Sequence, residues 1–193
     1  MNGKRGISPV VATVALVLIT FTAALIIAQY VVPFVKEELR ESSECFDYQQ
    51  DYFTFDEDSS YNCYVDVNGV KKYAVSIHAK TVSQEDAAKV IGLHFVFSSG
   101  ATSTPVQFFV GSRDPGLGPR FMIGGSTSSP TRADISIPQR GEIRTYGYDT
   151  TSINTQPPLY SSVSVHPILS NGRVCDVSDS IALVPCSSTV SIP

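Results

Sequence analysis

Residues 1–40 read MNGKRGISPVVATVALVLITFTAALIIAQYVVPFVKEELR. Lys4 and Arg5 stand directly before Gly6, and no Asp, Glu, Lys, Arg or His follows until Lys36. As an α-helix rising about 1.5 Å per residue, residues 7–35 would extend roughly 43 Å, which exceeds the roughly 30 Å of hydrocarbon in a bilayer. We therefore predict a helix that is apolar on every side and must be buried in lipid or among copies of itself.

The flanking residues indicate where this helix begins and ends. Ser8 is a plausible N-cap, and Pro9 falls in the first turn, where its missing N–H costs nothing. Tyr30 is placed as an interfacial aromatic residue would be, near the far end of the apolar stretch. Pro33 is expected to kink or interrupt the helix. The polar stretch VKEELRESSE that follows favours a solvated helical stalk to about Ser43.

Three interpretations of the segment compete, all with Lys4 and Arg5 in the cytoplasm and the rest of the chain after Val35 outside. A cleaved secretory signal has a short apolar core and a small-residue cleavage site, and this core is too long and lacks such a site. An uncleaved signal anchor fits the hydropathy. Cleavage between Gly6 and Ile7 would remove the charges and keep the whole helix, which makes sense if the helix functions outside the bilayer.

The string KRGISPVVATVALVLITFTAALIIAQYV at residues 4–31 resembles the amino terminus of archaeal type IV pilins, which have class III signal peptides and belong with archaellins to one superfamily. The likeness covers about the first 35 of the 193 residues. It implies that a prepilin peptidase reads Lys4 and Arg5, cuts after Gly6, and leaves Ile7 as the first mature residue. Archaellin helices usually begin without the Ser-Pro pair, so pilin is favoured over archaellin.

The resemblance also implies the partners. The helix would leave the membrane with the help of the pilus assembly machinery and pack with copies of itself in a homopolymeric filament. Bacterial type IV pilins have a glutamate at the fifth mature position, which is Val11 here. Register would therefore depend on apolar packing. We expect the filament core to contain Pro9, Val10, Val14, Val17, Leu18, Phe21, Leu25 and Ile26.

Four cysteines follow the apolar segment, at Cys45, Cys63, Cys175 and Cys186. They form no CxxC motif and no Cys/His cluster, so a zinc site is not indicated. Next to a membrane segment, two extracellular disulfides are the natural interpretation, although four buried free thiols or cytosolic disulfides of a hyperthermophile remain alternatives. Three pairings exist, and proximity in sequence favours Cys45–Cys63 and Cys175–Cys186.

The fold class we predict is α+β, with a signal peptide over 1–6, a hydrophobic helix and stalk over 7–44, and an antiparallel β-sandwich over 45–193. Short apolar or alternating runs separated by Gly, Pro and Ser favour an immunoglobulin-like sandwich. Asn68-Gly69 and Asn171-Gly172 are typical of tight turns between strands. The loops at 111–125 and 150–158 are expected to be exposed, and SQEDAAK at 83–89 to be briefly helical.

Candidate catalytic and metal-binding groups are few. His78, His94 and His166 lie in predicted strands without carboxylate or cysteine partners nearby, which favours satisfied or surface histidines. The loop GGSTSS at 124–129 lacks the GxSxG pattern of a nucleophile elbow. The acidic run DEDSS at 56–60 lacks the glycine and the terminal glutamate of an EF-hand and is best explained as a solvated loop. We expect no enzyme, no cofactor and no metal.

The formal net charge of −4, without a basic face, argues against nucleic-acid binding. The sequence therefore predicts a structural subunit of an archaeal pilus-like filament, membrane-inserted as a precursor and then extracellular, for adhesion or surface contact. The alternatives are a monomeric signal-anchored surface binding domain and an archaellin of a swimming filament. A membrane-tethered hydrolase has no site to support it.

Overall fold

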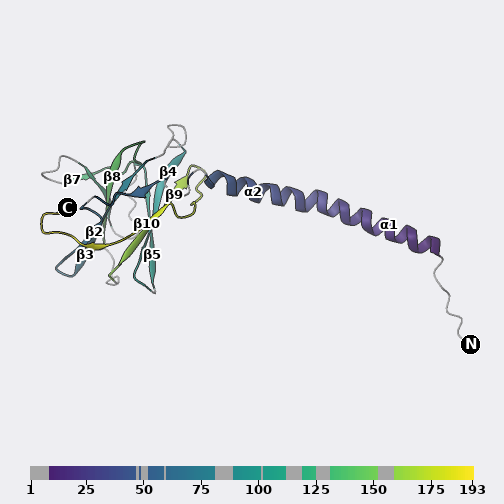
Figure 1. Ribbon diagram of the computed structural model, residues 1–193, viewed down its shortest axis with the longest axis horizontal. Helices are drawn as coiled ribbons and strands as arrows, with labels where there is room; N and C mark the ends of the chain where they lie inside the picture. The colour runs from purple at the N-terminus through teal and green to yellow at the C-terminus, as the bar shows by residue number, and fades with distance from the viewer. Residues whose placement is uncertain are drawn as a thin grey trace, which may run out of the picture. The chain divides into compact units, whose positions relative to one another are not determined.

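The computed structural model describes residues 9–46, 48, 52–58, 60–80, 89–100, 102–111, 119–124, 131–151 and 159–193, with the main chain alone over 37–43. The chain divides into two compact units, Met1–Phe46 and Asp47–Pro193. The first is helical, and the second is built of strands (Figure 1). An apolar N-terminal helix followed by a mostly antiparallel β-domain confirms the α+β prediction.

The helical unit contains α1 (Pro9–Ile26), a π-helical turn η1 (Ile27–Val31) and α2 (Val32–Phe46). The N–H of Val32 donates to the carbonyl of Ile27, five residues back, which defines the π-turn. Pro33 explains why this turn lies here, because it has no N–H to offer the carbonyl of Gln29 and its ring crowds that carbonyl. The interruption predicted at Pro33 is thus a local change of hydrogen bonding, and helix continues beyond Ser43 to Phe46.

Two sheets make up the β-domain. The larger has the order β11-β2-β3-β8-β6-β7, with β1 also paired to β3, and the smaller has the order β10-β9-β4-β5. Only β11 and β2 pair in parallel among the described strands. The larger sheet contains β1 (Thr54–Phe55), β2 (Cys63–Val67), β3 (Val70–His78), β6 (Arg120–Gly124), β7 (Thr131–Ala133), β8 (Ile143–Asp149) and β11 (Val184–Pro185). The smaller sheet contains β4 (Val90–Ser98), β5 (Ser103–Phe109), β9 (Ser162–Leu169) and β10 (Asp179–Ala182).

Both predicted Asn-Gly turns are confirmed. Asn68 and Gly69 join β2 to β3 with φ of 56° and 85°, the positive values that a two-residue hairpin turn requires at both positions. Gly172, with φ of 84°, lies in the turn after β9, where Ile168 and Val174 form an antiparallel bridge. The immunoglobulin-like arrangement of the strands stays a prediction.

The prediction of an exposed loop over 111–125 is wrong for residues 120–124. Residues 120–124 form β6, in which Phe121 and Met122 are buried against β8. Thr150, expected in an exposed loop, is buried and donates its N–H and its hydroxyl to the carbonyl of Lys71. Residues 83–88 of the predicted helix and residues 152–158 of the predicted loop lie outside the described residues.

Aromatic side chains form the core between the two sheets. Tyr73 of β3 and Tyr148 of β8 contact Phe97 of β4, with ring centroids 5.4 and 5.3 Å apart. Tyr146 of β8 lies 5.8 Å from Phe95 of β4 and extends the same layer. All five rings are fully buried. The alternation of strand side chains therefore places one face of each sheet in a shared apolar interior.

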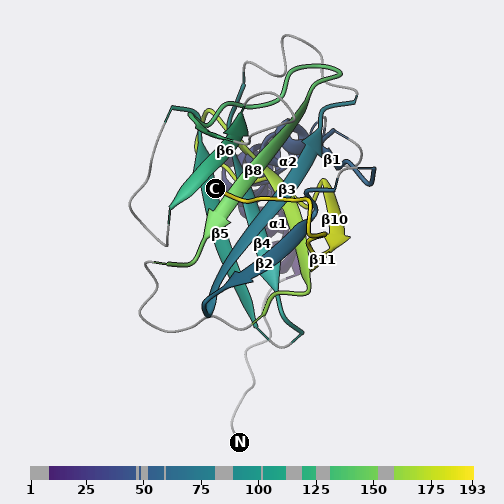
Figure 2. The same cartoon turned by 90° about the vertical axis from the view of Figure 1, so that its left-hand side faces the viewer.

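The C-terminal segment covers the outer face of the larger sheet. Its trace crosses β3 and β8 in Figure 2. Ile192 of this segment, Ala74 of β3 and Phe121 of β6 form a second buried cluster. Gly147 lies beneath the Phe121 ring, and an added Cβ there would approach the ring to 2.2 Å. Only glycine at this position lets the aromatic ring rest on the sheet.

The disulfides are confirmed, but the predicted pairing is wrong. Cys63 of β2 bonds to Cys186, 123 residues further along the chain, with the two Cα atoms 4.9 Å apart. Cys45 and Cys175 are also disulfide-bonded, and no cysteine is free. Proximity in sequence misled the prediction because β11 pairs beside β2, which brings the end of the chain to an early strand. The bond fastens the C-terminal segment to the sheet that it covers.

Candidate functional site

The exposed apolar surface of helix α1 is the candidate functional site. No residue of α1 is buried, and the exposed fractions reach 67% at Val10 and 68% at Ile19. As the sequence predicted, apolar side chains surround the whole helix and are not confined to one stripe. A helix of this kind is stable only where something apolar surrounds it.

The few polar side chains in this helix are satisfied within it. The hydroxyls of Thr13 and Thr20 each donate to the carbonyl three residues earlier, at 2.9 Å. Thr22 donates to the carbonyls of both Leu18 and Ile19 at 2.9 Å. Such bonds remove the cost of placing a hydroxyl in a dry environment. The surface therefore behaves as apolar even at its threonines.

Length and composition allow this helix to cross a membrane. The continuous stretch Pro9–Lys36 has 28 residues, and an 18-residue window within it has a mean hydropathy of 2.8. A membrane anchor or a signal sequence has these properties. The disulfides in the rest of the chain indicate an oxidising, extracellular environment.

The predicted functional residues fall into two groups. Lys4, Arg5, Gly6 and Ile7, the predicted cleavage residues, lie outside the described part of the chain. The residues predicted for a filament core all lie on α1 and are all exposed: Pro9, Val10, Val14, Val17, Leu18, Phe21, Leu25 and Ile26. Their availability for packing follows from this exposure.

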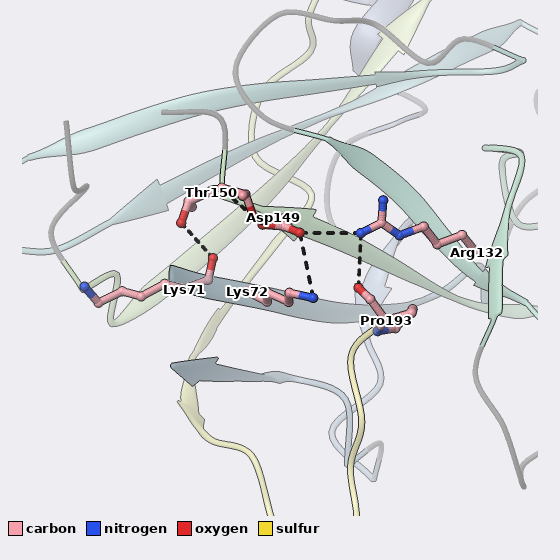
Figure 3. A network of polar contacts seen from close by, with 7 residues as sticks. Lys71, Lys72, Arg132, Asp149, Thr150 and Pro193 are labelled. Atoms are coloured by element: carbon pink, nitrogen blue, oxygen red, sulfur yellow. Dashed lines mark hydrogen bonds and ion pairs between the residues drawn. The ribbon is translucent and has the colours of Figure 1, made fainter. Parts of the chain in front are cut away.

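A polar cluster of the β-domain is centred on the buried Asp149, which sequence analysis did not single out (Figure 3). Its Oδ2 atom lies 3.8 Å from Nζ of Lys72 and 3.4 Å from Nη2 of Arg132. The Oδ1 atom accepts from the N–H of Thr151 at 2.9 Å and from its hydroxyl. Arg132 also donates to the main-chain oxygen of Pro193 at 3.3 Å.

This cluster holds strands together. Asp149 is buried, and both of its oxygens are occupied by donors from three segments of chain. The Arg132 guanidinium lies 4.5 Å from the centre of the Phe121 ring, so it joins β7 to β6 and to the last residue. A carboxylate with its lone pairs committed in this way has a structural role, which the sequence could not show because the partners are far apart in the chain.

The tyrosines of the core are likewise structural. Burial raises the pKa of Tyr73 and of Tyr148 to about 12, and it raises the pKa of Tyr146 further. These phenols therefore stay protonated at neutral pH. The hydroxyl of Tyr73 accepts from the N–H of Tyr160 at 3.3 Å, and that of Tyr146 donates to the carbonyl of Ser136 at 2.6 Å.

The acidic run at 56–60 lies beside β1. Glu57 and Asp58 are exposed, which agrees with a solvated loop. Asp47 and Asp51, which precede this run in the sequence, lie outside the described residues. Across the described part of the chain, no three side chains among His, Cys, Asp and Glu come together to hold a metal ion.

Two of the histidines meet, which the sequence did not predict. His94 of β4 and His166 of β9 are directly opposite each other, and their ring centroids are 5.7 Å apart. Burial, and next the neighbouring His166, lower the pKa of His94. His78, on β3 of the larger sheet, is not part of this pair.

Comparison with known proteins finds no matching family model, no matching curated protein and no matching solved structure.

Proposed function

We propose that this chain is a structural subunit of an archaeal type IV pilus-like extracellular filament, assembled by packing of its N-terminal helices. One observation carries the proposal: a helix of membrane-spanning length with no side chain buried along α1. The string KRGISPV at 4–10, by its resemblance to pilin precursors, supplies the processing step after Gly6. The role of the filament would be adhesion or surface contact.

Energetics supports self-packing outside the membrane. Large apolar side chains on the helix are mostly between 42% and 70% exposed. Burying one such side chain stabilises the buried state by roughly 1.5–3 kcal/mol. Burial along the whole helix would therefore favour assembly by tens of kcal/mol per subunit over a helix free in water. The same surface loses this driving force in lipid, which keeps the precursor monomeric there.

Register in such a bundle would come from shape. Position 11 is valine, so no carboxylate is present to pair with the new amino terminus of a neighbour. The threonine hydroxyls at 13, 20 and 22 are engaged within their own helix. Apolar packing of valine, leucine and isoleucine side chains is what remains to align the subunits.

The β-domain would form the outside of the filament. Its disulfide between Cys63 and Cys186 suits an oxidising exterior, and its aromatic core needs no partner to be buried. We propose an immunoglobulin-like sandwich for this domain, on the basis of its two facing sheets and short strands.

The alternative is a surface domain anchored as a monomer, and the length of Pro9–Lys36 suits that function equally well. An archaellin would share the helix and the processing. The fate of Lys4-Arg5-Gly6 separates the anchor from both filament proteins, because an anchor keeps these residues.

The test is amino-terminal sequencing with intact mass on material sheared from the cell surface. A chain beginning at Ile7 in a high-mass fraction is expected. Replacing Gly6 by a bulky residue should then leave unprocessed protein in the membrane and no filaments, with Gly3 replaced in the same way as the matched control. Protein beginning at Met1 and found only in detergent extracts would show an anchored monomer instead.

A further inference from the structure

The outer face of the smaller sheet brings together two imidazoles that are 72 residues apart in sequence. His94 and His166 are opposite each other on β4 and β9, and both are half-buried. Their inward neighbours Phe95 and Val165 belong to the core, so both histidines point to the other face. Each ring is held by further contacts.

His166 has the tautomer that a metal ligand needs. Its Nδ1 atom lies 3.2 Å from the carbonyl oxygen of Cys175. A carbonyl only accepts, so Nδ1 must carry the proton, and in the neutral ring the lone pair is on Nε2. The hydroxyl of Ser164 can donate to this lone pair at 3.1 Å, so a metal ion at Nε2 would displace that hydrogen bond. Metal-binding histidines are commonly oriented by a bond from the second ring nitrogen to a carbonyl in this manner.

His94 is held from its other side. The side-chain nitrogen Nε2 of Gln107 on β5 contacts its Nδ1 atom at 3.3 Å. An amide can turn to present its oxygen, which would accept a proton from Nδ1 and leave Nε2 bare.

The spacing of the rings fits a shared ion. With zinc–nitrogen distances of about 2.0–2.1 Å and a tetrahedral angle, two coordinating imidazoles have centroids about 5 Å apart. The observed separation is 5.7 Å and the ring planes are 83° apart, so the side chains would have to rotate before a nitrogen of each ring could face one ion. Cross-strand neighbours hold this spacing because the sheet fixes their main chains.

We propose that His94 and His166 form a surface site for an imidazole-preferring divalent cation, of the class of Zn²⁺, Ni²⁺ and Cu²⁺, which would link β4 to β9. Calcium and magnesium prefer carboxylate and carbonyl oxygens, and β4, β5 and β9, described throughout, place no carboxylate on this face. Two histidines leave the remaining coordination positions open to exchangeable ligands. The site lies wholly in the β-domain, so it is independent of the filament proposal.

The first test is calorimetric titration of the full-length protein in detergent with Zn²⁺. We expect one site in the unaltered protein and in His78→Ala, the matched control on the other sheet. Changes in the outer shell of metal sites already cost about 10–100-fold in affinity, so His94→Ala or His166→Ala should weaken binding at least tenfold. Unchanged affinity in either variant, or a similar loss in His78→Ala, would overturn the proposal.

A second measurement needs no variant and therefore does not depend on whether the variants fold. Protein labelled with ¹³C at histidine gives ring signals from its three histidines. Paramagnetic Ni²⁺ at low ratio should broaden the signals of His94 and His166 and spare that of His78. Broadening of all three signals alike, or of none, would show that the pair is not a selective metal site.

Discussion

The helix and the β-domain use apolar side chains in opposite ways. In the β-domain, Tyr73, Phe95 and Phe97 are at most 1% exposed; Phe97 contacts Tyr73 of the other sheet and lies beside Phe95 on its own strand. Along α1, no side chain is buried, although the helix is the more apolar unit. The β-domain is therefore stabilised by apolar side chains that it buries itself, whereas the side chains of α1 can be buried only by lipid or by other protein chains.

The largest effect we expect comes from Val17→Asp in the middle of α1. An ionised carboxylate buried in an apolar bundle without a partner costs several kcal/mol or more, so assembly should be lost. The β-domain should still fold, because it does not use this residue. Filaments are counted by electron microscopy, and the unfolding of the β-domain is followed by near-UV circular dichroism.

Val67→Asp is the matched control, at a valine that is 45% exposed at the end of β2. It adds the same charge to a surface that needs no burial, so filaments should persist. Normal filaments from Val17→Asp would break the comparison, because they would show that the helix is not packed in an apolar core.

Phe97→Ala should act on the β-domain alone. Phe97 contacts Tyr73, Tyr148 and Tyr160 and is 1% exposed. Removing such a side chain typically costs 3–5 kcal/mol of the free energy of unfolding. Urea unfolding of the full chain in detergent measures this loss.

Phe34→Ala makes the same chemical change in the helical unit, where Phe34 is 64% exposed. It should leave the urea midpoint of the β-domain unchanged. A shift comparable to that of Phe97→Ala would mean that the two units are not energetically separate.

The paired replacement Cys63→Ser with Cys186→Ser tests how the β-domain closes over its outer face. Loss of a native disulfide typically costs about 2–5 kcal/mol, and this one spans 123 residues. The segment bearing Ile192 should then come away from Ala74 and Phe121. Faster hydrogen exchange of the β2 and β3 amides would report it, while exchange in the helix should not change.

An unchanged free energy of unfolding would contradict this account of the C-terminal segment. It would mean that Arg132, through Asp149 and the oxygen of Pro193, holds the segment without the disulfide. Arg132→Ala in the serine pair would then be the variant that releases it.

Local patterns predicted the parts of the fold that depend on neighbours in sequence. Uninterrupted hydropathy predicted the helix at 7–35, and Asn68-Gly69 predicted a hairpin, because both signals are complete within a few residues. The strand at Arg120–Gly124 was missed because Gly116, Gly118 and Pro119 before it and Gly125 after it resemble a loop. Its burial comes from pairing with β8, which no local pattern contains.

The candidate sites likewise divide into one that a local string predicts and others that depend on strand pairing. The cleavage residues 4–7 were proposed from one short string, whereas the Cys63–Cys186 bond and the meeting of His94 with His166 depend on which strands lie side by side. Proximity in sequence gave the wrong cysteine pairs for this reason. The Asp149 cluster needs Lys72 from β3 and Arg132 from β7, and only the sheet order brings these together.

The smallest effect we expect is that of Thr20→Val, and it sharpens the comparison most directly. Valine has nearly the shape of threonine, and the hydroxyl of Thr20 is already bonded to the carbonyl of Val17 at 2.9 Å. Removing the hydroxyl leaves no buried group without a hydrogen bond, because the carbonyl of Val17 still accepts one from the helix main chain. The thermal stability of the filaments should therefore change only slightly. If the helices instead recognised one another through hydroxyls, Thr20→Val would weaken filaments markedly, and Thr13→Val would do so as well. Indifference to both replacements, together with loss of assembly in Val17→Asp, would leave apolar shape as the basis of contact between subunits.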